Sequence, residues 1–140
     1  MNPRWIIREP RPEDLSFIYS TWLNSFYYDS WAKSIRKSVY FNNYKKVLDR
    51  ILDSAHISIA CDPNDESVIY GYLISESDIA HYIYVKDAFR KFGIAKDLVN
   101  NDMNLLNEFQ FTHKTRHVLP IVMNKNQYTF NPILLFKQEM

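Results

Sequence analysis

Three stretches of the chain carry apolar residues three and four positions apart, the spacing that places side chains on one face of a helix. The first stretch begins near Glu13 and Asp14, whose carboxylates favour a helix N-terminus, and the second has Asn42 or Asn43 as its N-cap. The third follows Gly93. The predicted apolar faces are Leu15, Ile18, Tyr19, Trp22 and Phe26; Tyr44, Val47, Leu48, Ile51, Leu52 and Ala55; and Ile94, Ala95, Leu98, Val99, Met103, Leu106 and Phe109.

Shorter segments alternate between apolar and polar residues, or are rich in residues that favour strands. They cover residues 5–8, 57–61, 68–75, 79–85 and 117–123. Polar turns separate the three central segments, which predicts an antiparallel meander. Gly71 weakens the middle strand and predicts a bulge or a close approach of another backbone. Pro120 predicts a splayed or edge position in the last of these strands.

Composition indicates one globular domain over residues 1–140, because 46% of the residues are hydrophobic and 24% are charged. The chain shows no internal repeat and no Gly/Ser linker. The net charge of +1 gives no global field for nucleic acid or a membrane surface. A locally basic stretch is interpreted as a solvated helix face, and consists of Lys33, Arg36, Lys37, Lys45 and Lys46.

The single cysteine, Cys61, excludes an internal disulfide. The first residues carry no apolar signal-peptide core, and no apolar stretch approaches the length that spans a bilayer. A reducing, cytoplasmic location is the expectation.

The most informative local feature is the segment Arg90-Lys91-Phe92-Gly93-Ile94-Ala95, between the strand 79–85 and the third helix. Gly93 lacks a Cβ, so the backbone there can approach a ligand closely. The following helix would offer unpaired N–H groups and its positive dipole end to an anion. This arrangement predicts a phosphate-binding turn, with Arg90 as a charged donor at its entrance.

The spacing Arg90-x-x-Gly93-x-Ala95 resembles the acyl-CoA pyrophosphate loop of the GCN5-related N-acetyltransferases (the GNAT superfamily), and the order of predicted elements over residues 5–124 is similar to theirs. The resemblance implies an α/β (α+β) fold, with a mixed, mostly antiparallel sheet, a splayed central strand pair and flanking helices. It implies acetyl-CoA as acyl donor and an amine as second substrate. The implied cofactor-binding residues are Tyr84, Val85, Arg90, Lys91, Phe92, Gly93, Ile94, Ala95 and Asn124.

The end of the chain departs from this family, in which a helix and a general-acid tyrosine follow the fifth strand. Pro132 makes residues 125–132 a poor helix, so that helix is expected to be short or absent. The apolar run from Ile133 to Phe136 is interpreted as a last strand that completes the sheet. A truncated ending of this kind resembles small phage-encoded GNAT-like proteins.

Acetyl transfer in the GNAT superfamily needs a general base that removes a proton from the amine and a general acid that protonates the leaving thiolate. His81 is the candidate general base, and Tyr128 is the tyrosine nearest to the expected general-acid position. Glu76 and Asp78 lie in a turn just upstream of His81 and could act through water. His113 and His117 have a spacing compatible with a metal, but no Cys or carboxylate pair accompanies them, so no metal site is predicted.

Aromatic residues crowd the connection between the first two helices. In GNAT-like folds this region overhangs the acceptor cleft, but the same residues would also suit an ordinary core or a dimer face. They are Phe26, Tyr27, Tyr28, Trp31, Tyr40 and Phe41.

Two classes of function remain open. The first is an N-acetyltransferase that transfers an acetyl group from acetyl-CoA to a primary amine. The second is a GNAT-like binding or structural protein without turnover, which acts through a protein partner or as a homodimer. The retained phosphate-binding turn favours the enzyme, whereas the altered ending favours the second class.

Overall fold

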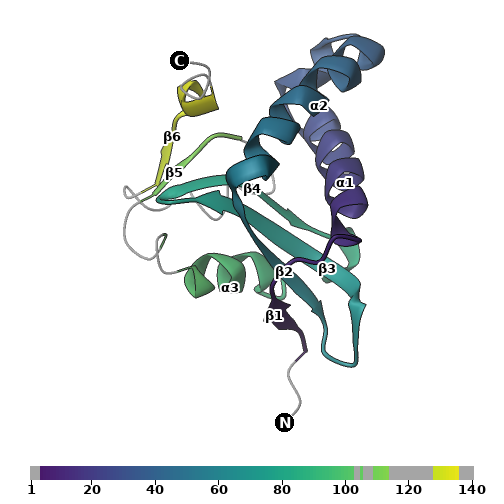
Figure 1. Cartoon of the computed structure of the whole chain (residues 1–140), viewed down its shortest axis with the longest axis vertical. Coiled ribbons are helices and arrows are strands. Elements are labelled where there is room, and N and C mark those ends of the chain that lie inside the picture. Colours follow the sequence, from purple (N-terminus) through teal and green to yellow (C-terminus); the bar gives the residue numbers. More distant parts are fainter. Residues whose placement is uncertain (1–3, 103–104, 106–108, 114–127, 136–140) are drawn as a thin grey trace.

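A computed structural model of the chain describes residues 4–102, 105, 109–113 and 128–135 (Figure 1). Its helices are α1 (Asp14–Asp29), α2 (Lys37–Ser54) and α3 (Ile94–Asn101), and short 3₁₀ turns form η1 (Trp31–Ser34), η2 (Asp87–Phe89) and η4 (Pro132–Leu135). Its strands are β1 (Ile6–Arg8), β2 (His56–Asp62), β3 (Asp65–Glu76), β4 (Ile79–Val85), β5 (Phe109–Phe111) and β6 (Tyr128–Phe130).

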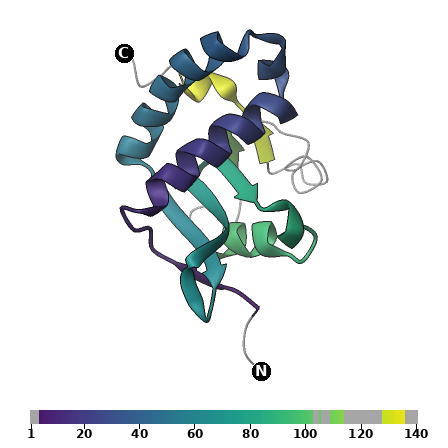
Figure 2. The ribbon, with the colours of Figure 1, turned by 90° about the vertical axis from the view of Figure 1, so that its right-hand side faces the viewer.

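The strands form one six-stranded sheet in the order β1-β2-β3-β4-β5-β6. Strands β1 to β4 pair antiparallel, as the predicted meander requires, whereas β5 is parallel to both β4 and β6. Helices α1 and α2 cover one face of the sheet and α3 covers the other, as the two views show (Figures 1 and 2). The predicted fold class, a mixed and mostly antiparallel sheet flanked by helices, is confirmed.

Each face of the sheet has its own hydrophobic core. The larger core, beneath α1 and α2, is rich in aromatic side chains, and includes Ile18, Trp22, Phe26, Leu48, Ile59, Tyr72, Ile74 and Tyr82. The smaller core, beneath α3, includes Ala60, Leu73, Ala80, Ile83, Ile94 and Leu98. Because β3 and β4 contribute to both cores, they are buried on both faces.

Two helix boundaries differ from the sequence-based prediction. Helix α2 begins at Lys37, so Asn42 and Asn43 lie inside it rather than at its N-cap. The extra turn is held by tertiary packing, because Tyr40 is buried and its hydroxyl donates to the carbonyl of Leu23 in α1, at 2.8 Å. Helix α3 ends at Asn101, and Phe109 belongs to β5 instead.

The end of the chain also differs. Residues Pro132–Leu135 form the 3₁₀ turn η4, so the prediction of a strand from Ile133 onward is wrong. Pro132 explains this, because it lacks the N–H that a strand ladder needs and its fixed φ suits the first position of a turn. The last strand in the described part of the chain is β6, just upstream. The predicted strand 117–123 lies outside the described residues.

Gly71 in β3 lies opposite Val85 of β4. A Cβ at this position would overlap the backbone carbonyl oxygen of Tyr84. The predicted close approach of a second backbone at Gly71 is therefore confirmed. The register between β2 and β3 also shifts beside it, between Ala60 and Cys61.

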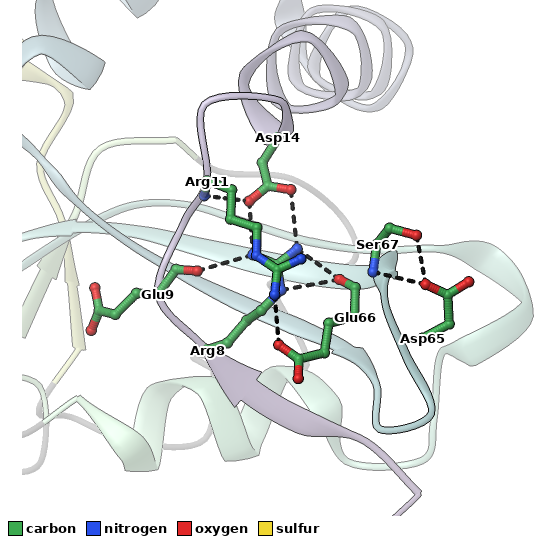
Figure 3. Close-up of polar contacts among 7 residues, drawn as sticks. All are labelled: Arg8, Glu9, Arg11, Asp14, Asp65, Glu66 and Ser67. Carbon is green, nitrogen blue, oxygen red and sulfur yellow. Dashed lines mark hydrogen bonds and ion pairs between the residues drawn. The ribbon is translucent and has the colours of Figure 1, made fainter.

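Arg8 joins three segments that are distant in the sequence (Figure 3). Its guanidinium donates to both carboxylate oxygens of Asp14, at 2.8 and 3.0 Å, and also to the backbone carbonyls of Glu9 and Glu66. The side chains of Arg8 and Asp14 are only 8% and 4% exposed. The pair therefore ties β1 and the start of α1 to the start of β3.

We expect Asp14→Ala to lower the free energy of unfolding by about 3 kcal/mol, because it leaves the Arg8 charge buried without its partner. Burial alone would raise the pKa of Asp14, but the hydrogen bonds from Arg8 and from the Arg11 backbone outweigh it, and the pKa is lowered. The stabilisation by the ionised Asp14 carboxylate is therefore complete above about pH 4, and it is lost as the pH falls through the lowered pKa of Asp14. Urea unfolding at pH 7 and pH 3 measures both effects.

The matched control is Arg11→Ala, which removes the half-exposed ion pair between Arg11 and Glu66. An exposed pair of this kind contributes less than about 1 kcal/mol. Equal losses for the two variants would contradict the role given to Arg8 and Asp14.

Candidate functional site

The turn after β4 has two residues in the left-handed region of backbone conformation. Gly93 has φ +99° and caps the N-terminus of α3, and Lys91 has φ +71°. A Cβ on Gly93 would meet no atom within 4 Å, so glycine is required there by its backbone conformation and not by space. A non-glycine residue such as Lys91 in this region is uncommon, and such residues cluster at ligand-binding sites.

The N-terminus of α3 carries no side-chain cap. The carbonyl of Gly93 accepts from the N–H of Asp97 at 2.9 Å, which starts the helix, whereas the preceding N–H groups belong to the first turn and have no partner inside the helix. Unpaired N–H groups at a helix start, next to a left-handed turn, form a concave surface that suits a phosphate. The structure thus brings together the predicted residues Lys91, Phe92, Gly93, Ile94 and Ala95.

Arg90 holds the turn against β4. Its Nε donates to the carbonyl of Val85 at 2.9 Å and its Nη1 donates to Asp87 at 2.9 Å. The sequence predicted a donor to the ligand, and the structure shows in addition a donor to the protein backbone. The carbonyl of Val85 is therefore already bonded within the protein.

Among the described residues, the edge of β4 that faces β5 is paired only at its start, where Ile79 and Ala80 pair with Gln110 and Phe111. Lys86 donates its backbone N–H to Tyr70 in β3, and neighbouring residues of a strand direct their backbone groups to opposite edges.

The backbone groups of Ile83 and Val85 consequently face the β5 edge, whereas those of Tyr84 face β3. Of the two predicted cofactor-binding residues in β4, Val85 therefore directs its backbone groups to the β5 edge and Tyr84 does not, and Ile83 shares the orientation of Val85. The Tyr84 side chain is half-buried in the aromatic core.

A pocket of about 270 Å³ lies against the other side of the turn. Two of the predicted cofactor-binding residues contribute to its wall, and the lining consists of Arg4, Trp5, Tyr70, Ala88, Phe89, Phe92 and Ile94. The wall is mostly aromatic and is fixed by stacking of Tyr70 on Phe89, with ring centroids 4.0 Å apart. The indole N–H of Trp5 donates to Asp97 of α3, at 2.8 Å.

His81, the predicted general base, sits at a β-bulge. Ile74 pairs with Tyr82 and Ser75 pairs with Ala80, so His81 is an extra residue of β4 with no partner in the ladder. The side chain is 2% exposed, and both ring nitrogens have partners: Nδ1 lies 2.9 Å from Thr112 Oγ1, and Nε2 lies 3.3 Å from Glu76 Oε1. Burial lowers the pKa of His81, although the neighbouring carboxylate of Glu76 acts in the opposite direction.

A second buried histidine lies beside the first. His113 Nδ1 is 2.8 Å from Thr112 Oγ1, and its Nε2 is 2.6 Å from the hydroxyl of Tyr44 in α2. Its ring contacts the rings of Trp22, Phe26 and Tyr82 edge-on. Burial, with a smaller effect of His81, lowers the pKa of His113 to about 3, so this ring is neutral at physiological pH.

Sequence reasoning did not find this group of polar residues. His113 was considered only as a metal ligand, and Thr112 and Tyr44 were not considered as site residues. The one available signal was a histidine directly after a threonine at the end of an apolar segment, which alone says nothing about a partner some 70 positions away. Among the described residues, no three His, Cys, Asp or Glu side chains come together as a metal site would need.

Tyr128 and Asn124 are the remaining predicted residues. Tyr128 begins β6 and pairs with Phe109, two residues before the partner of Ala80 in β4. Its backbone therefore lies toward the start of β4, whereas the turn at Gly93 follows the end of that strand. Asn124 lies outside the described residues.

The aromatic connection between α1 and α2 divides into two groups. Phe26, Tyr27 and Tyr40 are buried in the core, whereas Tyr28 and Trp31 are more than half exposed. Next to the buried group, the indole N–H of Trp22 has no hydrogen-bond acceptor among the described residues. A buried donor of this kind marks a place where a water or a ligand atom can accept a hydrogen bond.

No protein-family model matches the sequence, and no curated protein matches it. Solved structures do resemble it. A candidate acetyl transferase from Pyrococcus furiosus superposes with a TM-score of 0.58 at 14% identity, over 96% of this chain and 90% of the other. Apo YjaB from Escherichia coli superposes with a TM-score of 0.51 at 15% identity, over 69% of this chain and 63% of that one.

A GCN5-related N-acetyltransferase from Rhodopseudomonas palustris gives a TM-score of 0.50 at 15% identity, over 72% of this chain and 64% of the other. This chain thus spans slightly less than two thirds of the last two proteins. These similarities show that the chain has the GNAT fold, which the turn and the order of elements predicted. No helix in the described part of the chain is both long and apolar enough to cross a membrane.

We expect the His113 ring to stay neutral down to about pH 3, which an NMR titration of the imidazole signals can follow. Because the folded pKa is lowered, the neutral ring stabilises the fold fully above about pH 6.5, and this contribution is lost as the pH falls toward 3. The variant His113→Gln should lose less stability over that pH range than the wild type. A titration midpoint near 6.5 for His113 would contradict the buried position.

Proposed function

We propose that this chain is an N-acetyltransferase that uses acetyl-CoA as acyl donor and transfers the acetyl group to a primary amine. The observation that carries this proposal is the turn between β4 and α3, with left-handed Gly93 before an uncapped helix start, placed in a GNAT fold. An anion with extended apolar attachments suits this site, because the helix start attracts the charge and the adjacent pocket is aromatic.

The residues present fit a pyrophosphate and its attached arm. The N–H groups of Gly93, Ile94 and Ala95 would hold the pyrophosphate, and the β5-facing edge of β4, at Ile83 and Val85, would hold the pantetheine arm. Arg90 would keep the turn open by its bond to Val85, so we assign it to positioning as well as to charge. When bound, acetyl-CoA supplies a thioester as the activated acyl group.

The reaction then needs three things from the chain: removal of a proton from the amine, a donor to the oxygen of the tetrahedral intermediate, and a proton for the thiolate. A backbone N–H on the β4 edge would stabilise the oxygen. We keep His81 as the proposed base. Because both of its ring nitrogens are bonded to protein side chains, it would act through Thr112 rather than directly on substrate. Tyr128 remains a prediction for the general acid.

A second candidate function is a GNAT-like protein that binds a cofactor or a partner without turnover. The observation that favours it is that both nitrogens of His81 are occupied by protein side chains. Tyr128, moreover, starts a strand toward the other end of β4.

Acetyl-CoA should raise the midpoint of thermal unfolding, because a ligand that binds only the folded state stabilises it by about 2.7 kcal/mol at one hundred times its Kd. Gly93→Val should abolish this shift, since a β-branched residue is strongly disfavoured at φ +99° and the turn must change shape. The matched control is Gly93→Asn, which tolerates the left-handed conformation and should keep most of the shift. Differential scanning fluorimetry with each variant measures this.

Pantetheine lacks the pyrophosphate and should give a much smaller shift than acetyl-CoA. An unaltered shift for Gly93→Val, or an equal shift with pantetheine, would contradict the assignment of the pyrophosphate to this turn. An acetyl-CoA shift without acetylation of any amine in a panel of polyamines, aminoglycosides and peptide amines would favour the second candidate function.

A further inference from the structure

Five polar side chains from four parts of the chain form a continuous series of hydrogen bonds through the molecule. The series joins the Tyr44 hydroxyl, His113, Thr112, His81 and Glu76, with successive distances of 2.6, 2.8, 2.9 and 3.3 Å. Its three middle members are each no more than 3% exposed. Both imidazole rings therefore depend on these partners to satisfy their nitrogens.

Only one arrangement of protons satisfies every member when both histidines are neutral. The carboxylate of Glu76 can only accept, so His81 carries its proton on Nε2 and its Nδ1 is an acceptor. Thr112 must then donate its single hydroxyl proton to Nδ1 of His81, at 2.9 Å, rather than to the more distant backbone carbonyl of His81, at 3.4 Å. The Thr112 oxygen is left to accept from Nδ1–H of His113.

The same reasoning gives the proton positions at the Tyr44 end of the series. With its proton on Nδ1, His113 has an acceptor at Nε2, so the hydroxyl of Tyr44 must donate to it. The backbone carbonyl of His81 also accepts from the His113 ring and favours the same tautomer. All four hydrogen bonds thus point in one direction, from Tyr44 toward Glu76.

We propose that this series is a proton path, which carries the proton released by the acceptor amine from Tyr44 in α2 to the carboxylate of Glu76. The inference rests on the proposed function for its source of protons. In each transfer Tyr44 takes a proton from the amine and gives its own to Nε2 of His113. The Nδ1 proton of His113 moves to Thr112, the Thr112 proton moves to Nδ1 of His81, and the Nε2 proton of His81 moves to Glu76.

One proton leaves the amine and one arrives on Glu76, so the charges balance without a charged intermediate remaining in the core. Both ends of the path suit these roles. Tyr44 is half-buried and stacks on Phe26, and its ring centroid lies 6.4 Å from that of Trp31, which is 58% exposed in η1, between α1 and α2. Glu76 is 31% exposed at the end of β3, where it also accepts from Ser54, so its proton can pass to solvent.

The surroundings keep the path neutral at rest. The side chains that face the two histidines are Trp22 and Phe26 from α1, Tyr44 from α2, Glu76 from β3 and Tyr82 from β4. Of these, Glu76 carries the only carboxyl group. It lies at the far end of the series from Tyr44, where it bonds Nε2 of His81.

The decisive variant is Thr112→Val, which keeps the shape of the side chain but removes the hydroxyl that joins the two rings. We expect kcat for acetyl transfer at pH 7 to fall about 100-fold, the size of a typical acid–base contribution, with KM for acetyl-CoA unchanged. The defect should shrink as the pH rises toward the pKa of the amine, near 10, because a free amine needs no path. The matched control Thr112→Ser keeps the hydroxyl and should stay close to the wild type.

Long-range ¹H–¹⁵N NMR of the imidazoles tests the path without any substrate. The wild type should show His113 with its proton on Nδ1 and His81 with its proton on Nε2. Thr112→Val should lose this fixed pairing of tautomers, and Thr112→Ser should keep it. If Thr112→Val does not fold, Tyr44→Phe takes its place, since it removes only the hydroxyl at which the path begins.

The opposite tautomer on either ring would overturn the path, and so would a Thr112→Val enzyme with the kcat and pH profile of the wild type. A wild-type protein with the expected tautomers that neither binds acetyl-CoA nor acetylates amines would instead overturn the proposed function, and with it the amine as proton source. The two failures are therefore distinguishable.

Discussion

Strand β4 is paired with β3 along its length, but in the described part of the chain its other edge is paired with β5 only at Ile79 and Ala80. Buried backbone N–H and C=O groups must find partners, so other groups must serve the rest of this edge. The Nε of Arg90 binds one of these groups, the carbonyl of Val85. The candidate site lies at the end of β4, beyond the residues that pair with β5 in the described part of the chain.

This constraint also explains why the site is built with few charged side chains. Both faces of β4 are covered by hydrophobic cores, which fix the strand and hence the direction in which the turn at Gly93 leaves it. The start of α3 then faces outward from a rigid base. At the other end of the strand, the bulge at His81 turns an imidazole toward Thr112 and Glu76, and the buried histidine pair extends from there to α2.

Much of the fold could be predicted from the sequence, because strand patterns and glycine positions depend on residues that are close together in the chain. The strand Ile79–Val85 has the predicted bounds, and the backbone of Gly93 is left-handed, as a glycine between a strand and a helix suggests. The close approach at Gly71 was predictable for the same reason, since only glycine leaves room for a neighbouring carbonyl.

What the sequence did not predict depends on distant contacts. Helix α2 starts early because Tyr40 reaches Leu23 in α1, and the end of the chain forms β6 and a turn because β5 offers it an edge. The hydrogen-bond series joins Tyr44, His81 and His113, and no spacing in the sequence relates these three. The bond from Arg90 to the carbonyl of Val85, by contrast, spans only five positions and depends on the conformation of the turn between them.

The most direct test of the account is to follow the backbone amide signals of the ¹⁵N-labelled protein while acetyl-CoA is added. The account predicts that the largest shifts fall on the amides of Gly93, Ile94 and Ala95 and on Ile83 and Val85 at the open edge of β4. Shifts confined to the pocket beside Trp5 and Tyr70, or no shifts at millimolar acetyl-CoA, would contradict it.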